Sequence, residues 1–266
     1  MNELLMAAIA GVVEGITEIL PVSVTGHMAL FEFIFGFNGV SAKVIALLIQ
    51  WGAILSVGFL YQDEYLKLMK PAAWFQKPVG LSVWHVAAGM APTGLVAFAA
   101  HSLINKLSLS FFSVIIGLLL GAFLMLAAEK ISDRPGTSGV EKITLVQAFV
   151  VGLFQILSLW PGISRACSGI SGGLFAGLDR KTAADFSFIT AVPLMTVICF
   201  LNLEQNWTRL TPADFQMIAA GFVVAFAAAY FSAVWFLRFL GKSTLATFAY
   251  YRIVLAGFSY YYFFGH

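Results

Sequence analysis

Long runs of apolar residues dominate the chain, and most charged residues lie between these runs. A helix needs about 20 mainly apolar residues to cross the hydrocarbon core of a bilayer. Windows of that length predict six transmembrane helices, at residues 42–61, 82–101, 110–129, 183–203, 214–237 and 245–264. We therefore expect an all-α integral membrane protein.

Two further apolar stretches are interrupted near their middle. Residues 4–36 break at Leu20-Pro21, and residues 144–178 break at Trp160-Pro161-Gly162. Proline removes a backbone donor and glycine permits positive φ, so each stretch is expected to be a helix, a turn and a second helix. Broken backbone at membrane depth is tolerated only where protein or a wet cavity surrounds it. We therefore predict two re-entrant hairpins.

The two broken stretches resemble each other in sequence. Gly11-Val-Val-Glu14 precedes the first break as Gly152-Leu-Phe-Gln155 precedes the second, and three predicted spans follow each stretch. Because an odd number of spans separates the hairpins, they enter from opposite faces, which predicts an inverted-topology repeat as in secondary transporters. The chain is then a single membrane domain, 1–266, of two repeats, 1–135 and 140–266, whose breaks meet near the midplane.

Composition supports this class of protein. Hydrophobic residues make up 60% of the chain, charged residues 11%, and the mean hydropathy is +0.90, which is too apolar for a soluble domain of this size. A net charge of +2 without a basic cluster does not indicate a nucleic-acid partner, so membrane lipids are the expected surroundings. The first basic residue is Lys43, so no cleavable signal peptide is expected. Cys167 and Cys199 lack metal-ligand spacing and are expected to be free.

Basic residues in the predicted loops indicate the orientation, because cytoplasmic loops carry an excess of Lys and Arg. One side has ten of them: Lys67, Lys70, Lys77, Lys130, Arg134, Lys142, Arg180, Lys181, Arg238 and Lys242. The other side has three: Lys43, Lys106 and Arg209. We therefore expect both termini outside the cell. Arg165 and Arg252 remain within embedded segments, and Arg165 is the expected electrostatic partner of Glu14 and Glu18.

Glu14 and Glu18 are the most informative polar residues, because they lie in an otherwise uncharged apolar stretch. A charge at membrane depth costs about 2.5 kcal/mol or more, so such acids usually serve a function. Four residues apart on a helix, they share one face, and their repulsion is relieved by a cation, a shared proton or an arginine. A divalent cation, Mg²⁺ or Ca²⁺, bridging to phosphate oxygens fits that need. The alternative is a pair of protonated, hydrogen-bonded structural acids.

The residues after the first break add candidate chemistry. Ser23 and Thr25 supply hydroxyls, and His27 is suited to proton transfer near neutral pH. With the two acids upstream, these side chains predict a site for phosphorus chemistry. The alternative is that His27 is a satisfied structural residue.

The residues at the second break predict a phosphate or pyrophosphate site. Gly162, Ser164, Arg165 and Ser168 offer backbone N–H groups, hydroxyls and a planar guanidinium at a helix start. Glycines at four-residue spacing in this segment also suit close helix packing, so both roles are open. Gly117 and Gly121 have the same spacing without a polar companion, and we expect them to serve packing alone.

These motifs resemble the undecaprenyl-diphosphate phosphatases linked to bacitracin resistance. The similar segments cover nearly the whole chain: Gly11–His27, Gln155–Arg165, Ala184–Pro193 and Phe248–Arg252. The resemblance implies a multi-pass enzyme of the bacterial inner membrane that removes the terminal phosphate of the C55 isoprenoid diphosphate at the outer face, recycling a lipid carrier for cell-wall synthesis. By position, it implies that Glu14 and Glu18 act with a divalent metal or in proton transfer. It likewise implies that His27 is a nucleophile or acid/base, and that Arg165 binds phosphate.

Two positions depart from the family pattern. Val24 stands where the family has the second serine of Pro-Val-Ser-Ser-Thr-Gly-His, and Ala166 stands where it has a serine after the arginine. Valine has no nucleophilic atom, so we expect His27 or an activated water to attack, with Ser23 and Thr25 assisting. Ser168 offers a replacement for some of the lost hydrogen bonds.

The leading hypothesis is hydrolysis of a polyprenyl diphosphate. The alternative is a transporter that moves a polyprenyl phosphate or a related anionic lipid without hydrolysis, because transport needs an anion site but no nucleophile. A membrane scaffold is a third hypothesis, which does not explain charges at two converging breaks. The sequence leaves open the lipid chain length, the metal, and whether the chain forms a homo-oligomer.

Overall fold

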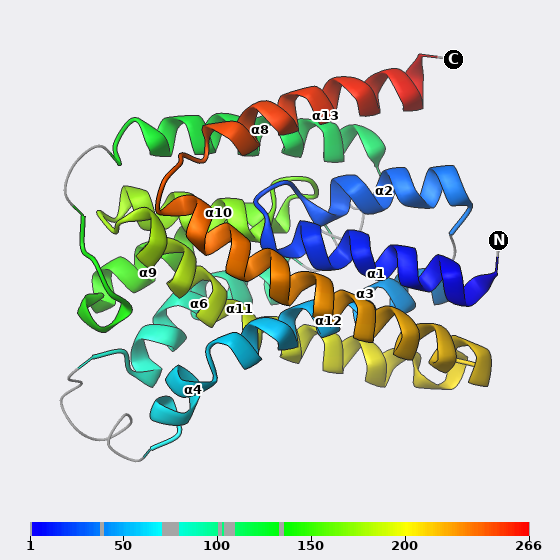
Figure 1. Ribbon diagram of the computed structural model, residues 1–266, viewed down its shortest axis with the longest axis horizontal. Coiled ribbons are helices and arrows are strands. Elements are labelled where there is room, and N and C mark those ends of the chain that lie inside the picture. The colour runs from blue at the N-terminus through cyan, green and yellow to red at the C-terminus, as the bar shows by residue number, and fades with distance from the viewer. Residues whose placement is uncertain are drawn as a thin grey trace.

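The computed structural model is a bundle of helices (Figure 1). It describes residues 2–37, 40–70, 80–100, 103, 110–132 and 136–265. The α-helices of these ranges are α1 (Glu3–Ile19), α2 (Val24–Phe35), α3 (Val40–Leu60), α4 (Gln62–Leu68), α6 (Val83–Ala99), α8 (Phe111–Glu129), α9 (Leu145–Gln155), α10 (Arg165–Phe175), α11 (Arg180–Asn206), α12 (Pro212–Leu240) and α13 (Ala246–Phe264). Three 3₁₀ turns complete the set: η1 (Val140–Lys142), η2 (Ile156–Leu159) and η3 (Trp207–Arg209).

Four helices in the described ranges are long and apolar enough to cross a membrane, which confirms the all-α membrane class. They are Ala42–Leu60, Phe111–Glu129, Arg180–Asn206 and Pro212–Leu240, and each matches a predicted span. The other two predicted spans are also helical, as α6 with 17 residues and α13 with 19, but they are not among these four. Residue 101, the predicted end of one span, lies outside the described residues.

Polar residues just before the helices explain where many of them begin. The side chains of Asn2, Ser110, Thr144, Asp179 and Thr211 each accept a hydrogen bond from a backbone N–H in the first turn of the helix that follows. Such a cap satisfies one of the otherwise unpaired donors and stabilises a helix by about 1 kcal/mol. Cys167 and Cys199 are both free, as expected, and both are buried.

Small residues let α1 pack closely along α12 (Figure 1). A methyl group added at Gly11 would collide with the carbonyl oxygen of Gly221, and one added at Gly15 would come within 2.6 Å of the carbonyl oxygen of Ala225. Close backbone approach through small residues is the usual way in which membrane helices pack. This packing fixes the rotation of α1 and therefore the direction in which its two acids point.

The last helix lies beside α8 (Figure 1). Leu118 of α8 and Leu255 of α13 belong to one buried apolar cluster, together with Leu30 of α2. Helix α8 thus connects the helix after the first break to the last helix. The start of α1 and the end of α13 lie at the same end of the molecule (Figure 1).

Candidate active site

The first break is a short turn that ends in a serine with an unusual backbone conformation. Leu20 is extended, with φ −77° and ψ 144°, as a residue before proline prefers. Ser23 has φ 78°, and its Oγ accepts a hydrogen bond from the N–H of Gly26 at 3.2 Å, which caps α2. A serine in this region of backbone space carries strain of about 1 kcal/mol or more.

The second break repeats this geometry. Trp160 is extended before Pro161, with φ −78° and ψ 125°. Ser164 has φ 76°, and its Oγ accepts a hydrogen bond from the N–H of Cys167 at 3.3 Å, which caps α10. In the part of the chain that the structure describes, Ser23 and Ser164 are the non-glycine residues with positive φ. Strain of this kind clusters at functional sites, which marks both turns as candidates.

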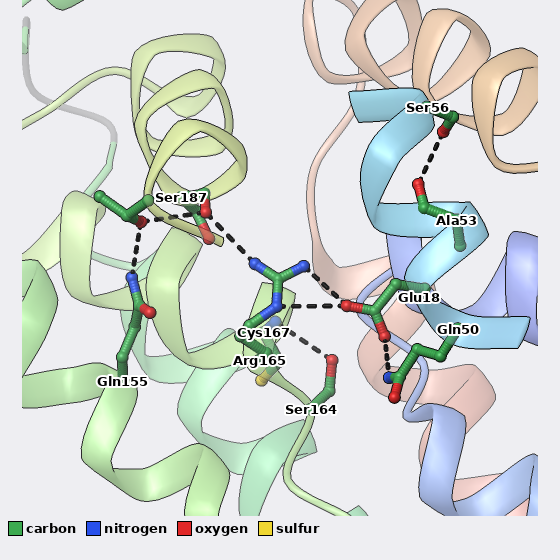
Figure 2. Close-up of polar contacts among 10 residues, drawn as sticks. Glu18, Gln50, Ala53, Ser56, Gln155, Ser164, Arg165, Cys167 and Ser187 are labelled. Carbon is green, nitrogen blue, oxygen red and sulfur yellow. Dashed lines mark hydrogen bonds and ion pairs between the residues drawn. The ribbon is translucent and has the colours of Figure 1, made fainter. Parts of the chain in front are cut away.

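An ion pair connects the two broken stretches, as predicted for Arg165 (Figure 2). The Arg165 guanidinium donates to Oε1 of Glu18 from Nη2 at 2.8 Å and from Nε at 3.2 Å. The side chains are only 9% and 4% exposed. Loss of either partner would leave the other as an unpaired buried charge, which is strongly destabilising, so the pair stays together. The expected pairing of Arg165 is therefore confirmed for Glu18, whereas Arg165 forms no ion pair with Glu14 among the described residues.

Neighbouring polar groups hold both members of this pair in place. Gln50 of α3 donates its Nε2 to Oε2 of Glu18 at 2.5 Å. The remaining Arg165 nitrogen, Nη1, donates to the carbonyl oxygen of Ser187 at 3.2 Å, and Figure 2 shows the guanidinium lying between that carbonyl and Glu18. Both carboxylate oxygens of Glu18 therefore have partners.

Two cavities lie beside α2, and the ion pair lines the smaller of them. The smaller has a volume of about 180 Å³, and the polar residues in its wall are Glu18, Thr25, Gln50, Thr93, Ser158, Ser164 and Arg165. The larger has a volume of about 600 Å³, and its wall includes Glu14, Thr25, Glu32, Lys43, Gln50 and Asn202. Val24, Thr25, Gln50 and Ile198 line both cavities, so the two adjoin. The smaller cavity holds the charged groups of both breaks and is the candidate site for a phosphate.

The structure brings some of the predicted site residues together and separates others. Four of them line the smaller cavity: Glu18, Thr25, Ser164 and Arg165. Glu14 lines only the larger one of the two. Three of the remaining four are enclosed in the fold: Ser23 caps α2, Gly162 packs against α8 with φ 95°, and Ser168 is fully buried.

His27 lines neither of these two cavities. Its Nδ1 lies 2.8 Å from the carbonyl oxygen of Ser23, and its Nε2 lies 2.7 Å from the hydroxyl of Tyr251 on α13. Since a carbonyl can only accept, the neutral ring carries its proton on Nδ1 and accepts the tyrosine hydroxyl at Nε2. The two rings are also stacked, with centroids 5.8 Å apart. This ring is therefore bound between the first turn and α13.

Sequence reasoning missed three residues around the site. Gln50 could have been recognised from the sequence, because a lone amide within an apolar helix usually finds a polar partner. Tyr251 lies in Phe248–Arg252, one of the segments similar to the family, but the sequence does not indicate its contact with His27. Arg252 was recognised as embedded, but it had no assigned partner.

The expectation that Gly117 and Gly121 serve packing alone was wrong. Nη2 of Arg252 donates to the carbonyl oxygen of Gly117 at 2.9 Å, and a side chain at Gly121 would collide with the same guanidinium. These glycines therefore accommodate the guanidinium of Arg252 and the backbone of the second turn. Glycines that serve packing alone have the same four-residue spacing, so the spacing could not reveal the contact with Arg252.

The contacts of Glu14 and Glu18 determine whether either acid could hold a metal ion. No group of three or more His, Cys, Asp or Glu residues in the described ranges is arranged to hold a metal ion. Glu18 already has partners on both oxygens, whereas Oε2 of Glu14 is buried without a hydrogen-bond partner among the described residues. Mg²⁺ is commonly held by only one or two carboxylates, with substrate phosphates completing its shell. Glu14 therefore fits such a cation.

Comparisons with known proteins show the family of this chain. The family model described as bacitracin resistance protein BacA matches residues 7–258. Undecaprenyl-diphosphatase 1 of Bacillus thuringiensis (strain Al Hakam) is 40% identical over 256 residues, which cover 96% of this chain and 97% of that protein. Undecaprenyl-diphosphatase of Nitratidesulfovibrio vulgaris (strain DP4) is 37% identical over 262 residues, which cover 98% of this chain and 99% of that protein. The chain belongs to the BacA family of bacitracin resistance proteins.

Proposed function

We propose that this protein hydrolyses undecaprenyl diphosphate to undecaprenyl phosphate and inorganic phosphate. The curated relatives that support this proposal carry the name undecaprenyl-diphosphatase. The observation that carries it is the ion pair between Arg165 and Glu18, which joins a cation of one break to an acid of the other in the wall of a cavity. A diphosphate needs a cation to bind and an acid–base group to react, and this pair supplies both.

Arg165 is proposed to bind the terminal phosphate. Its planar guanidinium now takes the Glu18 carboxylate at 2.8 and 3.2 Å, and a phosphate presents oxygens in a similar two-point arrangement. When phosphate replaces the carboxylate, Arg165 neutralises charge on the substrate and Glu18 is released. Ser164 adds a polar group beside Arg165 in the same wall.

Water is the proposed nucleophile. Val24 offers no hydroxyl and His27 is bound to Ser23 and Tyr251, whereas Thr25 is exposed to both cavities and can hold a water there. The oxygen of that water attacks the terminal phosphorus, and the bond from phosphorus to the bridging oxygen breaks. Glu18, released from Arg165, takes the proton of the water. Undecaprenyl phosphate leaves with the bridging oxygen.

His27 is proposed to orient the first turn rather than to attack. It bonds the backbone carbonyl of Ser23 on one side and the hydroxyl of Tyr251 on the other. Ser23 in turn caps α2, the helix that presents Thr25 to the cavity.

Glu14 is proposed as the residue that would hold a divalent cation, Mg²⁺ or Ca²⁺, whereas Glu18 serves as the base. The unpartnered carboxylate oxygen of Glu14 and the oxygen-rich wall of the larger cavity support this assignment. Such a cation would supply positive charge against the phosphate oxygens.

We also propose the finer membrane arrangement: six spans, two re-entrant hairpins and an inverted repeat, 1–135 and 140–266, in the bacterial inner membrane. The two matched serine turns support the repeat. The placement of α1 and α2 toward one end of the molecule and of α9 toward the other supports opposite entry (Figure 1). The basic loops support a cytoplasmic face opposite the termini, although Lys77, Lys106 and Arg134 of that count lie outside the described residues.

Phosphate release by the purified protein tests the function. With a short isoprenyl diphosphate and Mg²⁺ or Ca²⁺, we expect release that EDTA abolishes and that returns when the cation is restored. Vesicles with a fluorescent polyprenyl phosphate test the alternative in parallel. Translocation of that lipid without any phosphate release would refute the enzyme and support a transporter.

A further inference from the structure

Arg252 is the most deeply buried charged residue that the proposed reaction does not use. It lies on α13 and is 0% exposed. Within the described ranges it forms no ion pair with a carboxylate, and its five hydrogen bonds go to five backbone carbonyl oxygens. A charge at this depth is expensive, so its retention calls for a role that these carbonyls define.

Three of these carbonyls belong to the two breaks. Nη1 donates to Pro21 at 3.2 Å and to Ile163 at 2.7 Å, and Nη2 donates to Gly162 at 2.7 Å. Pro21 and Gly162 are equivalent positions, because each stands two residues before the serine with positive φ. One planar group therefore holds the same peptide of both strained turns.

The other two carbonyls anchor the guanidinium to α8. Nε donates to Leu118 at 3.1 Å, and Nη2 donates to Gly117 at 2.9 Å. All five N–H groups of the arginine are thereby used, and a lysine with three donors on one atom has no equivalent geometry. Gly121 leaves the necessary space, because a side chain there would collide with the guanidinium.

We propose that Arg252 is a positioning residue of the active site, which holds the first turn, the second turn and α8 in one register. This inference rests on the proposed phosphatase function. Glu18 lies before one turn and Arg165 follows the other, so the distance between them depends on how the two turns are joined. A displacement of about 1 Å between reacting groups is enough to lower a rate about 100-fold.

Kinetics of Arg252→Lys test the role. We expect kcat to fall about 100-fold while KM stays within a small factor, because lysine keeps the charge but cannot join both turns. Gly121→Ala displaces the guanidinium without altering it and should lower kcat in the same way. Gly257→Ala is the matched control on α13, where an added methyl meets open space, and it should behave as the wild type.

Hydrogen exchange of the backbone amides gives a readout that does not need activity. In folded Arg252→Lys and Gly121→Ala, we expect faster exchange in segments 20–27 and 160–168 together, with no change in Gly257→Ala. An unchanged kcat in either folded variant, or loosening of only one segment, overturns the proposal. Failure of both variants to fold also overturns it, since Arg252 would then support the whole fold. If the wild type releases no phosphate, the proposed function fails, and the exchange result still decides whether Arg252 joins the turns.

Discussion

The two breaks have the same backbone conformation, but their side chains differ in chemistry. Ser23 and Ser164 have φ of 78° and 76°, and each caps a helix through the N–H three residues on. Nine residues before these serines stand Glu14 in the first stretch and Gln155 in the second. The residue directly after the serine is Val24 in one and Arg165 in the other. The first stretch therefore carries the acid, and the second carries the cation.

The hydrogen bonds of Gln155 show how the second stretch differs from the first. Its Nε2 donates to the hydroxyl of Thr190 at 3.1 Å, and that hydroxyl bonds the carbonyl of Ser187, which also accepts from Arg165. Gln155 is thus linked to Arg165 through Thr190 and the carbonyl of Ser187. Among the described residues, Oε2 of Glu14 and Oε1 of Gln155 are both buried without a partner, but only the side chain of Glu14 is an acid. A duplicated turn can be used for opposite charges when the flanking helices differ, and the substrate site arises between the copies.

Removal of the cation should give the largest effect. Arg165→Gln leaves the second turn in place but deletes the charge that faces phosphate, and we expect phosphate release to fall about 1,000-fold. Lys181→Gln, on an exposed side chain of α11, is the control and should differ from wild type by about twofold at most. A folded Arg165→Gln protein with near-normal release would break the assignment of charge to the second break.

The equivalent positions Glu14 and Gln155 allow a direct contrast. Glu14→Gln should lower kcat about 100-fold and raise the Mg²⁺ concentration needed for half-maximal release, because it removes the proposed cation ligand. Gln155→Leu should instead lower the free energy of unfolding by about 1 kcal/mol through a lost hydrogen bond. Its metal dependence should remain that of the wild type. Equal metal responses in the two variants would contradict different roles for these positions.

Val24→Ser restores the hydroxyl of the family pattern in the first break. If water attacks, as proposed, the added hydroxyl should change release by much less than the about 100-fold that a positioned catalytic group contributes. Thr25→Val, which removes the hydroxyl that lines both cavities, should cause the larger change. A strong gain in Val24→Ser would instead show that a serine nucleophile limits the rate.

Asp179 lies outside both breaks, and its substitution should have the smallest effect of these changes, a small loss of stability. It caps α11, the helix that carries Ser187, and accepts the N–H of Thr182 at 2.7 Å. Burial alone would raise the pKa of Asp179, but hydrogen bonds from Thr182 and Ser138 hold this pKa below its ordinary value. The stabilisation is therefore complete above the unfolded pKa of about 3.9 and is lost as pH falls through the lower folded pKa.

Thermal unfolding in detergent checks this pH dependence. Asp179→Ala should be less stable than wild type by about 1 kcal/mol at pH 7, and the difference should shrink toward pH 3. Asp63→Ala, at an exposed position of α4, is the control. A difference that grows as the pH falls would contradict the sign of the pKa shift.

Much of the fold and of the charged pair could be predicted from the sequence. The breaks at Pro21 and Pro161 follow from proline itself, and the meeting of Glu18 with Arg165 follows from the cost of leaving either charge alone in an apolar chain. The contacts of Arg252 could not be predicted, because its partners are backbone carbonyls, which every residue carries. The position of His27 outside both cavities could not be predicted either, because it depends on Tyr251, a neighbour that is distant in sequence.

We propose that Glu18 and Arg165 act as one unit across the two breaks. The most direct test compares phosphate release by wild type, Glu18→Gln, Arg165→Gln and the double variant. Groups that act as a unit show strongly non-additive losses, so the double variant should lose no more activity than the more severe single variant. Losses that multiply in the double variant would show that the two residues act independently and would contradict the account.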